Sequence, residues 1–537
     1  MNTRAVLVTL ALAGSLATPV GVSYAAKPHH GHHHGHHHGH HSGHHGHHGT
    51  PHANQPTVRN SCLTSIPDPG TTTPVKICYT LFRPARAKNR HKVPMLLHSH
   101  GWAGSRTTDP AKFKKFLDAG YAVLSFDQRG FGESGGQAYV ENPDVEGYDV
   151  RAIVDRFARW PWVKKDGPGD PLLGAMGGSY GGGYQFLGAF EELRLHGKPI
   201  FDALAPEITW HDLAQSLAPS GVVRTEWALA LSAASLPSQA LPTSVYKALV
   251  EGAALGQLPD GSVPGTENLA AFFEKNGPRW HIAQGRRLDI PVLFGQGTTD
   301  TLFPLQQGLA NWHLAITKKA RKRSIFVAYN GGHTLPAVLP QGVNVASDPC
   351  SKELAGGSFA DLTLRFFDEQ LKGLKTGLTG YRRLHLATPD SQCLTVRDDA
   401  PTKAFPIGDV TTLTTAGVPM ATKVADGPIS IAGSPSVTAD VTTLGLDTRI
   451  FYGLAVGTNA LTAHLVQNNV LPLREISPVT GQATTFALPS TAVQVPAGQS
   501  LFLLATPVSD TFVAMGSRPP GLITLGNTVV KLPVVTP

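Results

Sequence analysis

Short apolar runs and helical periods alternate along the first 380 residues of the chain. Residues 75–82 and 93–98 alternate or run apolar, as core strands do. Val150, Ile153 and Phe157 recur at helical spacing, which predicts a helix with one core-facing side. Further strands are expected at 121–126, 172–176, 201–208, 290–294 and 324–329. This alternation predicts an α/β core.

Two regions depart from this pattern. Residues 209–285 are rich in helical apolar patches and predict a helical cap, in which Trp210, Trp227 and Trp280 are candidates for lining a pocket. From about Leu384 to the end, short Thr/Val/Leu/Ala-rich segments alternate with turn residues, which predicts a C-terminal β-sandwich over 384–537. A structural support for the cap is the default role of that domain, and a binding module is the alternative.

The first 56 residues contain two segments that are not expected to belong to the folded domains: a secretory signal and a tract that does not fold. Arg4, an apolar run from Ala5 to Ala17 and small residues up to Ala25 are typical of a secretory signal over 1–25. No later apolar run is long enough to span a membrane. Residues 26–56 form a His/Gly tract that holds 15 of the 25 histidines and has too few apolar residues to fold. The tract is either a solubilising spacer or a weak divalent-metal site. The histidines that carry the metal hypothesis include His32, His33, His34, His36, His37 and His38.

Composition narrows the class of protein. Only 15% of residues are charged, and the basic residues behind the net charge of +7 are dispersed, which excludes a nucleic-acid partner. Four cysteines fit an oxidising compartment and allow three pairings, of which sequence proximity favours two bridges. These are Cys62–Cys78 and Cys350–Cys393. The sequence indicates no oligomeric state.

The candidate chemistry centres on Ser179. A short apolar run leads into Gly177-Gly178-Ser179-Tyr180-Gly181, and a helix is expected at 184–193. This strand–turn–helix context is what a nucleophile elbow requires, because the serine must project above the sheet. The glycines on either side leave room for the neighbouring strand and helix.

An acid and a base follow in the order that an α/β-hydrolase uses. Asp300 comes after the strand 290–294, and His333 comes after the strand 324–329. A serine hydroxyl needs a base to take its proton, and the acid fixes the tautomer of that base. The sequence therefore predicts a Ser179–Asp300–His333 triad. The backbone N–H groups of Trp102 and Tyr180 are the candidates for the oxyanion hole. His211, in the cap, is a candidate pocket residue. Asp127 and Arg129 are expected to form a structural charge and hydrogen-bond pair.

These motifs resemble a known family. His100-Gly101-Trp102, Asp-x-Arg-Gly-x-Gly-x-Ser from 127 to 134, Trp-Pro-Trp at 160–162 and the Ser179 motif follow the order found in X-prolyl dipeptidyl-peptidase and cocaine esterase-like serine hydrolases. The resemblance covers about 75–371 and implies an α/β-hydrolase domain over 57–383 with an inserted cap, plus a C-terminal jelly roll. Cocaine esterase-like members commonly use a tyrosine near Trp102 as an oxyanion donor, and tryptophan lacks that hydroxyl.

The expected function is an exported serine hydrolase that needs no cofactor and cleaves a small ester, or a peptide as an X-Pro dipeptidyl-peptidase does. A peptidase of that kind needs an acid for the free amino group, and Glu207, Glu226 and Glu251 are candidates in or near the cap. The alternative is an inactive hydrolase fold that binds metal at the surface through the His tract.

Overall fold

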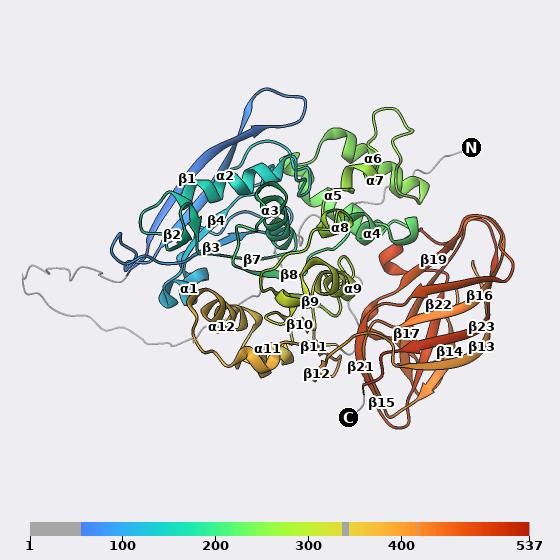
Figure 1. Ribbon diagram of the computed structural model, residues 1–537. Coiled ribbons are helices and arrows are strands. Elements are labelled where there is room, and N and C mark those ends of the chain that lie inside the picture. The colour runs from blue at the N-terminus through green and yellow to red at the C-terminus, as the bar shows by residue number, and fades with distance from the viewer. Residues whose placement is uncertain (1–54, 336–342, 416, 536–537) are drawn as a thin grey trace, which may run out of the picture.

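The computed structural model describes residues 55–335, 343–415 and 417–535. An α/β part and an all-β part lie side by side, and a group of helices reaches from the first toward the second (Figure 1). The expected secretory signal and the His/Gly tract up to residue 54, with all six named histidines, lie outside the described residues.

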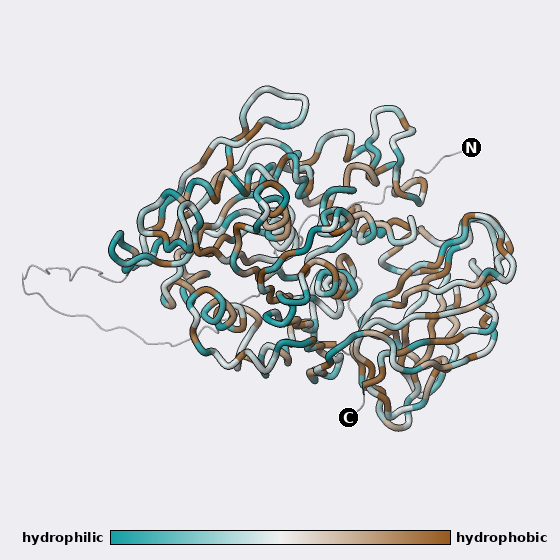
Figure 2. The backbone as a smooth tube through the Cα atoms, viewed as in Figure 1, coloured by the Kyte–Doolittle hydropathy of each residue, from teal (hydrophilic) through white to brown (hydrophobic). Residues whose placement is uncertain are grey.

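A ten-stranded sheet forms the centre of the α/β part. It is parallel from β4 through β11 and antiparallel at both edges. The middle strands are buried on both faces, because their sequences are nearly continuous apolar runs (Figure 2). In spatial order the strands are β1 (Thr57–Pro67), β2 (Pro74–Arg83), β4 (Ala122–Phe126), β3 (Met95–Ser99), β7 (Leu173–Gly178), β8 (Ala203–Glu207), β9 (Leu293–Gly297), β10 (Ile325–Tyr329), β11 (Leu384–Ala387) and β12 (Cys393–Val396).

Helices cover both faces of this sheet. One apolar core includes residues of α2 (Glu146–Ala158), α3 (Tyr180–His196) and α9 (Leu305–Ala310). The core on the other face includes residues of α1 (Lys114–Ala119), α11 (Pro349–Ala355) and α12 (Phe359–Lys372). The predicted stripe of α2 is buried at Val150, Ile153 and Phe157. The α/β-hydrolase architecture expected from the sequence is confirmed.

Both favoured disulfides are formed. Cys62–Cys78 joins directly opposite residues of β1 and β2, and Cys350–Cys393 joins α11 to β12. Each bridge ties an antiparallel edge strand of the sheet to a neighbouring element.

The chain between β8 and β9 forms helices that cover the carboxyl ends of the strands (Figure 1). They are α4 (Leu213–Leu217), α5 (Thr225–Ser235), α6 (Thr243–Leu255), α7 (Leu269–Phe273) and α8 (Pro278–Ala283). We refer to α4–α7 as the cap. No helix within the described ranges has the length and apolar character that crossing a membrane requires.

The C-terminal part is a β-sandwich, as predicted. Two sheets enclose an apolar core to which Val437, Tyr452 and Leu503 belong. One sheet has the order β13 (Lys403–Leu413), β23 (Leu522–Leu532), β16 (Ser436–Leu444) and β20 (Gln482–Ala487). The other contains β14 (Met420–Asp426), β22 (Ser500–Thr506), β17 (Thr448–Gly457), β18 (His464–Leu465) and β19 (Leu471–Glu475).

The sandwich is bonded directly to the cap. Arg449 Nη1 donates to the carbonyl of Gly256, just after α6, at 2.8 Å. Arg474 Nη1 donates to the carbonyl of Gly221 at 3.1 Å. An apolar cluster that includes Ala228 and Phe512 fills the space between the two parts. The sandwich therefore supports the face of the cap that is turned away from the sheet.

The pairing expected between Asp127 and Arg129 is wrong. Asp127 instead accepts hydrogen bonds from the backbone and guanidinium of Arg106. Arg129 donates to Asp68 at 2.8 Å and to Asp149 at 2.9 Å. The two side chains diverge because they follow β4 in a turn, where neighbouring residues face different elements.

Candidate active site

Ser179 lies at the sharp turn between β7 and α3. Its backbone has φ 58° and ψ −122°, a conformation that costs a side chain of order 1–3 kcal/mol. A Cβ on Gly181 would approach the carbonyl oxygen of Ser99 to 2.4 Å, so only glycine fits there. The Ser179 N–H donates to the Glu207 carbonyl at 2.9 Å, which ties the turn to the end of β8. The expected elbow geometry is present.

The three predicted triad residues are joined by two hydrogen bonds. His333 Nε2 lies 2.8 Å from Ser179 Oγ, and His333 Nδ1 lies 2.6 Å from Asp300 Oδ2. The other carboxylate oxygen, Asp300 Oδ1, accepts the N–H groups of Leu302 at 3.0 Å and Phe303 at 2.7 Å. Asp300 is fully buried and His333 is 14% exposed, so the chain of bonds runs from the interior toward a cavity.

Glycine allows His333 to come so close to Asp300. Gly332 has φ +103°, and a Cβ there would lie 2.6 Å from the Cβ of Asp300. The rings of Phe303 and Trp227 contact the His333 ring edge-on, at centroid distances of 5.1 and 5.8 Å. The imidazole is therefore fixed by packing as well as by its two hydrogen bonds.

The His-Gly turn after β3 lies next to the nucleophile. A Cβ on Gly101 would be 3.7 Å from the Cβ of Ser179. Trp102 and Tyr180, the two residues assigned to the oxyanion hole, both line the cavity with Ser179. The indole N–H of Trp102 donates to the Leu231 carbonyl at 3.0 Å, so the side chain is already engaged. A donor from Trp102 to a substrate would have to be its backbone N–H.

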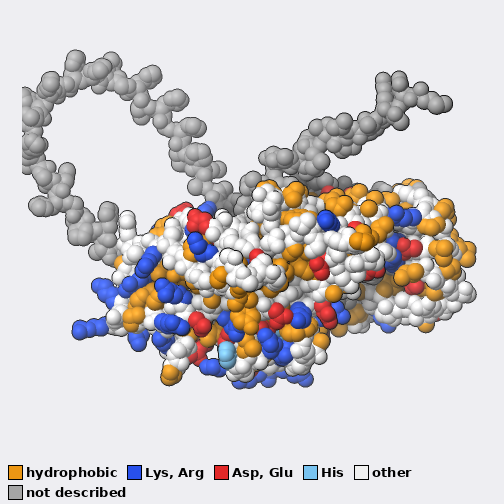
Figure 3. All heavy atoms as spheres, turned by 90° about the horizontal axis from the view of Figure 1, so that it is seen from above, with side chains coloured by type: hydrophobic (Ala, Val, Ile, Leu, Met, Phe, Trp, Pro, Cys, Tyr) orange, Lys and Arg blue, Asp and Glu red, His pale blue; other side chains and the backbone are white. Residues whose placement is uncertain are grey.

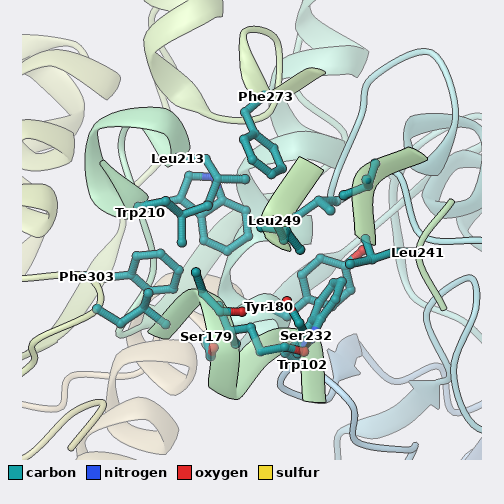
Figure 4. Close-up of a pocket in the computed structure, with 16 residues that line it drawn as sticks. Trp102, Ser179, Tyr180, Trp210, Leu213, Ser232, Leu241, Leu249, Phe273 and Phe303 are labelled. Carbon is teal, nitrogen blue, oxygen red and sulfur yellow. Dashed lines mark hydrogen bonds between the residues drawn. The ribbon is translucent and has the colours of Figure 1, made fainter. Parts of the chain in front are cut away.

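A narrow apolar cavity of about 70 Å³ opens above Ser179. In Figure 4 the rings of Trp210, Phe273 and Phe303 and the side chain of Leu249 surround the space over the serine. The cap contributes most of this wall. Among the described residues, no charged side chain lines the cavity.

Sequence reasoning did not identify most of the lining residues. Val245 and Leu249 lie one turn apart on α6, and Leu241, just before the helix begins, continues the same four-residue spacing. That spacing was available in the sequence as a signal for an apolar helix face. It could not show that these side chains face Ser179 rather than an ordinary core.

Several predicted pocket residues lie elsewhere. Trp210 lines the cavity, but Trp280 packs on His281 at 4.7 Å and Trp227 reaches Thr301 through its indole N–H at 3.0 Å. His211 is buried, and its Nδ1 lies 2.9 Å from Asn311 Oδ1. The hypothesis that His211 belongs to the pocket is wrong, because its ring is turned toward α9 and the segment that follows it.

The three glutamates considered as amine anchors do not line the cavity. Glu207 lies at the end of β8, and its Oε2 accepts the Tyr329 hydroxyl at 3.2 Å. Burial raises the pKa of Glu207 to about 7. Burial also raises the pKa of Glu226, and the nearby Asp510 of the sandwich adds to the rise. None of the three offers a carboxylate to a substrate above Ser179.

One basic side chain, Arg224, affects the electrostatic potential at Asp300. Arg224, at the start of α5, is 2% exposed, and its Nε donates to the Ser216 carbonyl at 2.9 Å. Burial lowers its pKa to about 9, and the charge of Asp300 opposes that fall. Arg224 thus adds positive potential near the buried carboxylate without a direct ion pair.

The one group of described residues with metal-ligand spacing lies away from this site. His313, Asp398 and Asp399 have ligand atoms within 4.8 Å of one another. Asp399 is already bonded to His313 and to the Ser434 hydroxyl, the latter at 2.6 Å. Both of its oxygens are therefore engaged in holding the start of the sandwich to the α/β part.

Parts of this chain are similar to a known family and to curated proteins. Residues 73–334 match the model of the family described as X-Pro dipeptidyl-peptidase (S15 family). The chain is 32% identical over 106 residues to an uncharacterised 31.7 kDa protein of Escherichia coli, which covers 19% of this chain and 35% of that protein. It is 25% identical over 171 residues to a putative serine esterase of Mycobacterium tuberculosis (strain CDC 1551 / Oshkosh), which covers 28% of this chain and 26% of the relative. The matches thus span about a third or less of the length of these curated relatives.

Solved structures share the fold over nearly the whole chain. A CocE/NonD family hydrolase from Staphylococcus aureus has a TM-score of 0.59 at 12% identity and covers 89% of this chain and 97% of its own. An α-amino acid ester hydrolase has a TM-score of 0.59 at 15% identity, with coverages of 90% and 98%. An aminopeptidase from a marine sediment archaeon of the Thaumarchaeota has a TM-score of 0.60 at 14% identity, with coverages of 91% and 97%. These likenesses show a common overall fold.

Proposed function

We propose that this chain, whose residues 73–334 match the model of the X-Pro dipeptidyl-peptidase (S15) family, is a serine hydrolase that cleaves esters with an uncharged, apolar acyl group. One observation carries the proposal. Ser179 Oγ lies 2.8 Å from a histidine that is bonded to a buried aspartate, and the serine opens into an apolar cavity.

The proposed mechanism is acyl transfer in two halves. Ser179 Oγ attacks the ester carbonyl while His333 Nε2 takes its proton. Asp300 holds the imidazole in the required tautomer and stabilises the imidazolium. The backbone N–H groups of Trp102 and Tyr180 receive the developing oxyanion. His333 then gives the proton to the departing alcohol, and the same groups activate a water molecule that releases the acid.

The cavity favours an ester over an X-Pro dipeptide. A dipeptidyl-peptidase must bind the free ammonium group of its substrate, and a buried ammonium without a carboxylate partner is costly. The described residues that line the cavity include no acid. An apolar acyl group of an ester, in contrast, gains from burial against Leu213, Leu249 and Phe273.

The intact set of three residues also argues against an inactive scaffold. A protein that only binds metal has no need of a serine in a strained turn. We further propose that the protein acts outside the cytoplasm. Its first 25 residues have the pattern of a secretory signal, and two disulfides are typical of an oxidising compartment.

Two assays test the proposal. A fluorophosphonate probe should label the wild-type protein and leave Ser179→Ala unlabelled, and labelling of both or of neither would contradict a reactive Ser179. Hydrolysis of p-nitrophenyl hexanoate should then exceed that of Gly-Pro-p-nitroanilide by at least about 100-fold in kcat/KM, a difference of roughly 2.7 kcal/mol in barrier. A preference for the anilide would reverse the assignment to peptidase.

A further inference from the structure

A second hollow lies outside the cavity and shares none of its lining residues. It has a volume of about 240 Å³ and lies between the β1–β2 hairpin and the carboxyl end of α2. Its walls come from three separate segments, around residues 57–59, 79–83 and 156–162. We call it the basic groove.

Three arginines line the basic groove, and no lining residue is acidic. Arg59 and Arg83 lie on adjacent strands, where Arg59 is opposite Leu81 and Arg83 is opposite Thr57. Arg156 comes from the last turn of α2. Among the described residues, none of the three guanidinium groups takes part in an ion pair, unlike Arg106 and Arg129 nearby. Figure 3 shows basic side chains gathered around apolar ones at the end of the molecule that carries the hairpin.

The floor of the basic groove is aromatic and fixed. Trp160 and Trp162 stack at a centroid distance of 5.3 Å, and the Arg83 guanidinium lies 4.8 Å from the centre of the Trp162 ring. Arg83 Nε donates to the Ala87 carbonyl at 2.9 Å, and Nη2 donates to the same oxygen. Nη1 of Arg83 has no partner among the described residues. This side chain is therefore held in place with one donor free.

These features select a class of ligand. Guanidinium groups bind carboxylate, sulfate and phosphate through paired N–H donors. The apolar floor of Tyr79, Leu81 and the partly exposed Trp160 favours a flat apolar body next to the anionic group. Three short segments bound the basic groove, which fits a small molecule, whereas a long polyanion binds along open surfaces.

We propose that the basic groove binds a small organic anion, whose acidic group is held by Arg59, Arg83 and Arg156 and whose flat apolar body lies against Trp160. This inference does not depend on the activity of Ser179. It assigns a ligand to residues that the hydrolytic mechanism does not use.

Isothermal titration calorimetry with 2-naphthoate tests the proposal on the full-length protein. We expect 1:1 binding to the wild type, and at least tenfold weaker binding to the double variant Arg59→Gln/Arg156→Gln. Both replaced side chains are exposed and unpaired, so the variant should keep the melting temperature of the wild type. Arg59→Lys/Arg156→Lys should recover part of the affinity, because it restores the charge without the paired donors.

Matched controls separate the basic groove from other places where naphthalene could bind. Arg397→Gln removes another exposed, unpaired arginine and should leave the affinity unchanged. Neutral 2-naphthamide should bind at least tenfold more weakly than 2-naphthoate. Titration with the naphthalene analogues that carry a sulfonate or a phosphate group in place of the carboxylate identifies which acidic group the basic groove prefers. Equal binding of 2-naphthoate to the wild type and the glutamine double variant would overturn the proposal, as would binding of heparin without any binding of the naphthalene anions.

Discussion

The cavity over Ser179 has two walls that are built by different means. On the sheet side, bonds to main-chain groups hold the proposed triad: Asp300 Oδ1 accepts two N–H groups, and the Ser179 N–H donates to the end of β8. On the cap side, the wall consists of apolar side chains such as Leu213, Leu249 and Phe273. These are positioned by packing against one another and, indirectly, by the sandwich behind them.

This difference between the two walls predicts that the sheet side determines the rate of the reaction and the cap side determines which substrate is preferred. The N–H and C=O groups that make these bonds remain when a neighbouring side chain is replaced, so we expect most variants to retain the geometry of the sheet side. Side-chain packing on the cap side can be altered one residue at a time. Changes on the sheet side should therefore reduce kcat, whereas changes on the cap side should act mainly on KM and on preference between esters.

The largest expected effect is on the sheet side. Asp300→Asn keeps the shape of the acid but favours the wrong histidine tautomer, and it should lower kcat for p-nitrophenyl hexanoate by about 10³–10⁴-fold with little change in KM. Steady-state kinetics measure this directly. A loss below tenfold would mean that Asp300 is not the acid of the triad.

A change on the cap side should come next in size. Leu249→Asp places a carboxylate in the apolar wall and should reduce kcat/KM for the same ester by roughly 10–100-fold, because the acyl group then faces a charge. Leu249→Met, which conserves volume, is the matched control and should stay within threefold of the wild type. The comparison between the walls would fail if Leu249→Asp reduced kcat and left KM unchanged.

The support behind the cap should have a smaller effect on activity and a measurable one on stability. Arg449→Met removes the bonds to the Gly256 and Met515 carbonyls and the ion pair with Asp447, and each hydrogen bond to a charged group contributes about 1.5–3 kcal/mol. Urea unfolding and KM should both shift in this variant. Arg518→Met is the control, because Arg518 bonds the Ala254 carbonyl at 2.6 Å from an exposed position and should cost less.

The smallest effect on activity is expected at the half-buried Glu207, whose replacement should change the pH dependence of stability instead. The pKa of Glu207 is raised to about 7 by burial, so the folded state keeps a proton that the unfolded state releases near pH 4.5. Folding stability therefore falls as pH rises from about 4.5 through 7. Glu207→Gln removes this penalty and should gain about 2–3 kcal/mol more over the wild type at pH 8 than at pH 5.

Urea unfolding of Glu207→Gln at the two pH values measures this difference. Glu353→Gln, at an exposed position on α11, is the control and should show no such gain. A gain for Glu207→Gln that is equal at both pH values would contradict a protonated Glu207 in the folded state.

The sequence was sufficient to predict the α/β core, the sandwich and the positions of Ser179, Asp300 and His333. These features depend on local patterns: apolar periodicity, glycines around a turn, and polar residues directly after strands. The cysteine pairs followed from proximity along the chain. In each case the signal is a short local stretch of sequence or, for the cysteines, the nearest available partner along the chain.

Features that depend on distant segments could not be predicted. The partners of Asp127 and Arg129 come from loops and helices whose paths the sequence does not reveal. Val245 and Leu249 of α6 face Ser179 only because of the way the cap folds over the sheet. The basic groove joins three arginines through the register of β1 with β2 and the position of the end of α2.

The bonds between cap and sandwich also have a kinetic consequence. Swinging the cap away as a rigid lid would break the bonds of Gly256 and Gly221 and expose Phe512 in one step. Rotation of a single partly exposed side chain such as Leu249 breaks none of these bonds and is faster than the microseconds to milliseconds of domain motion. Substrate should therefore reach Ser179 past moving side chains in a cap whose backbone stays in place.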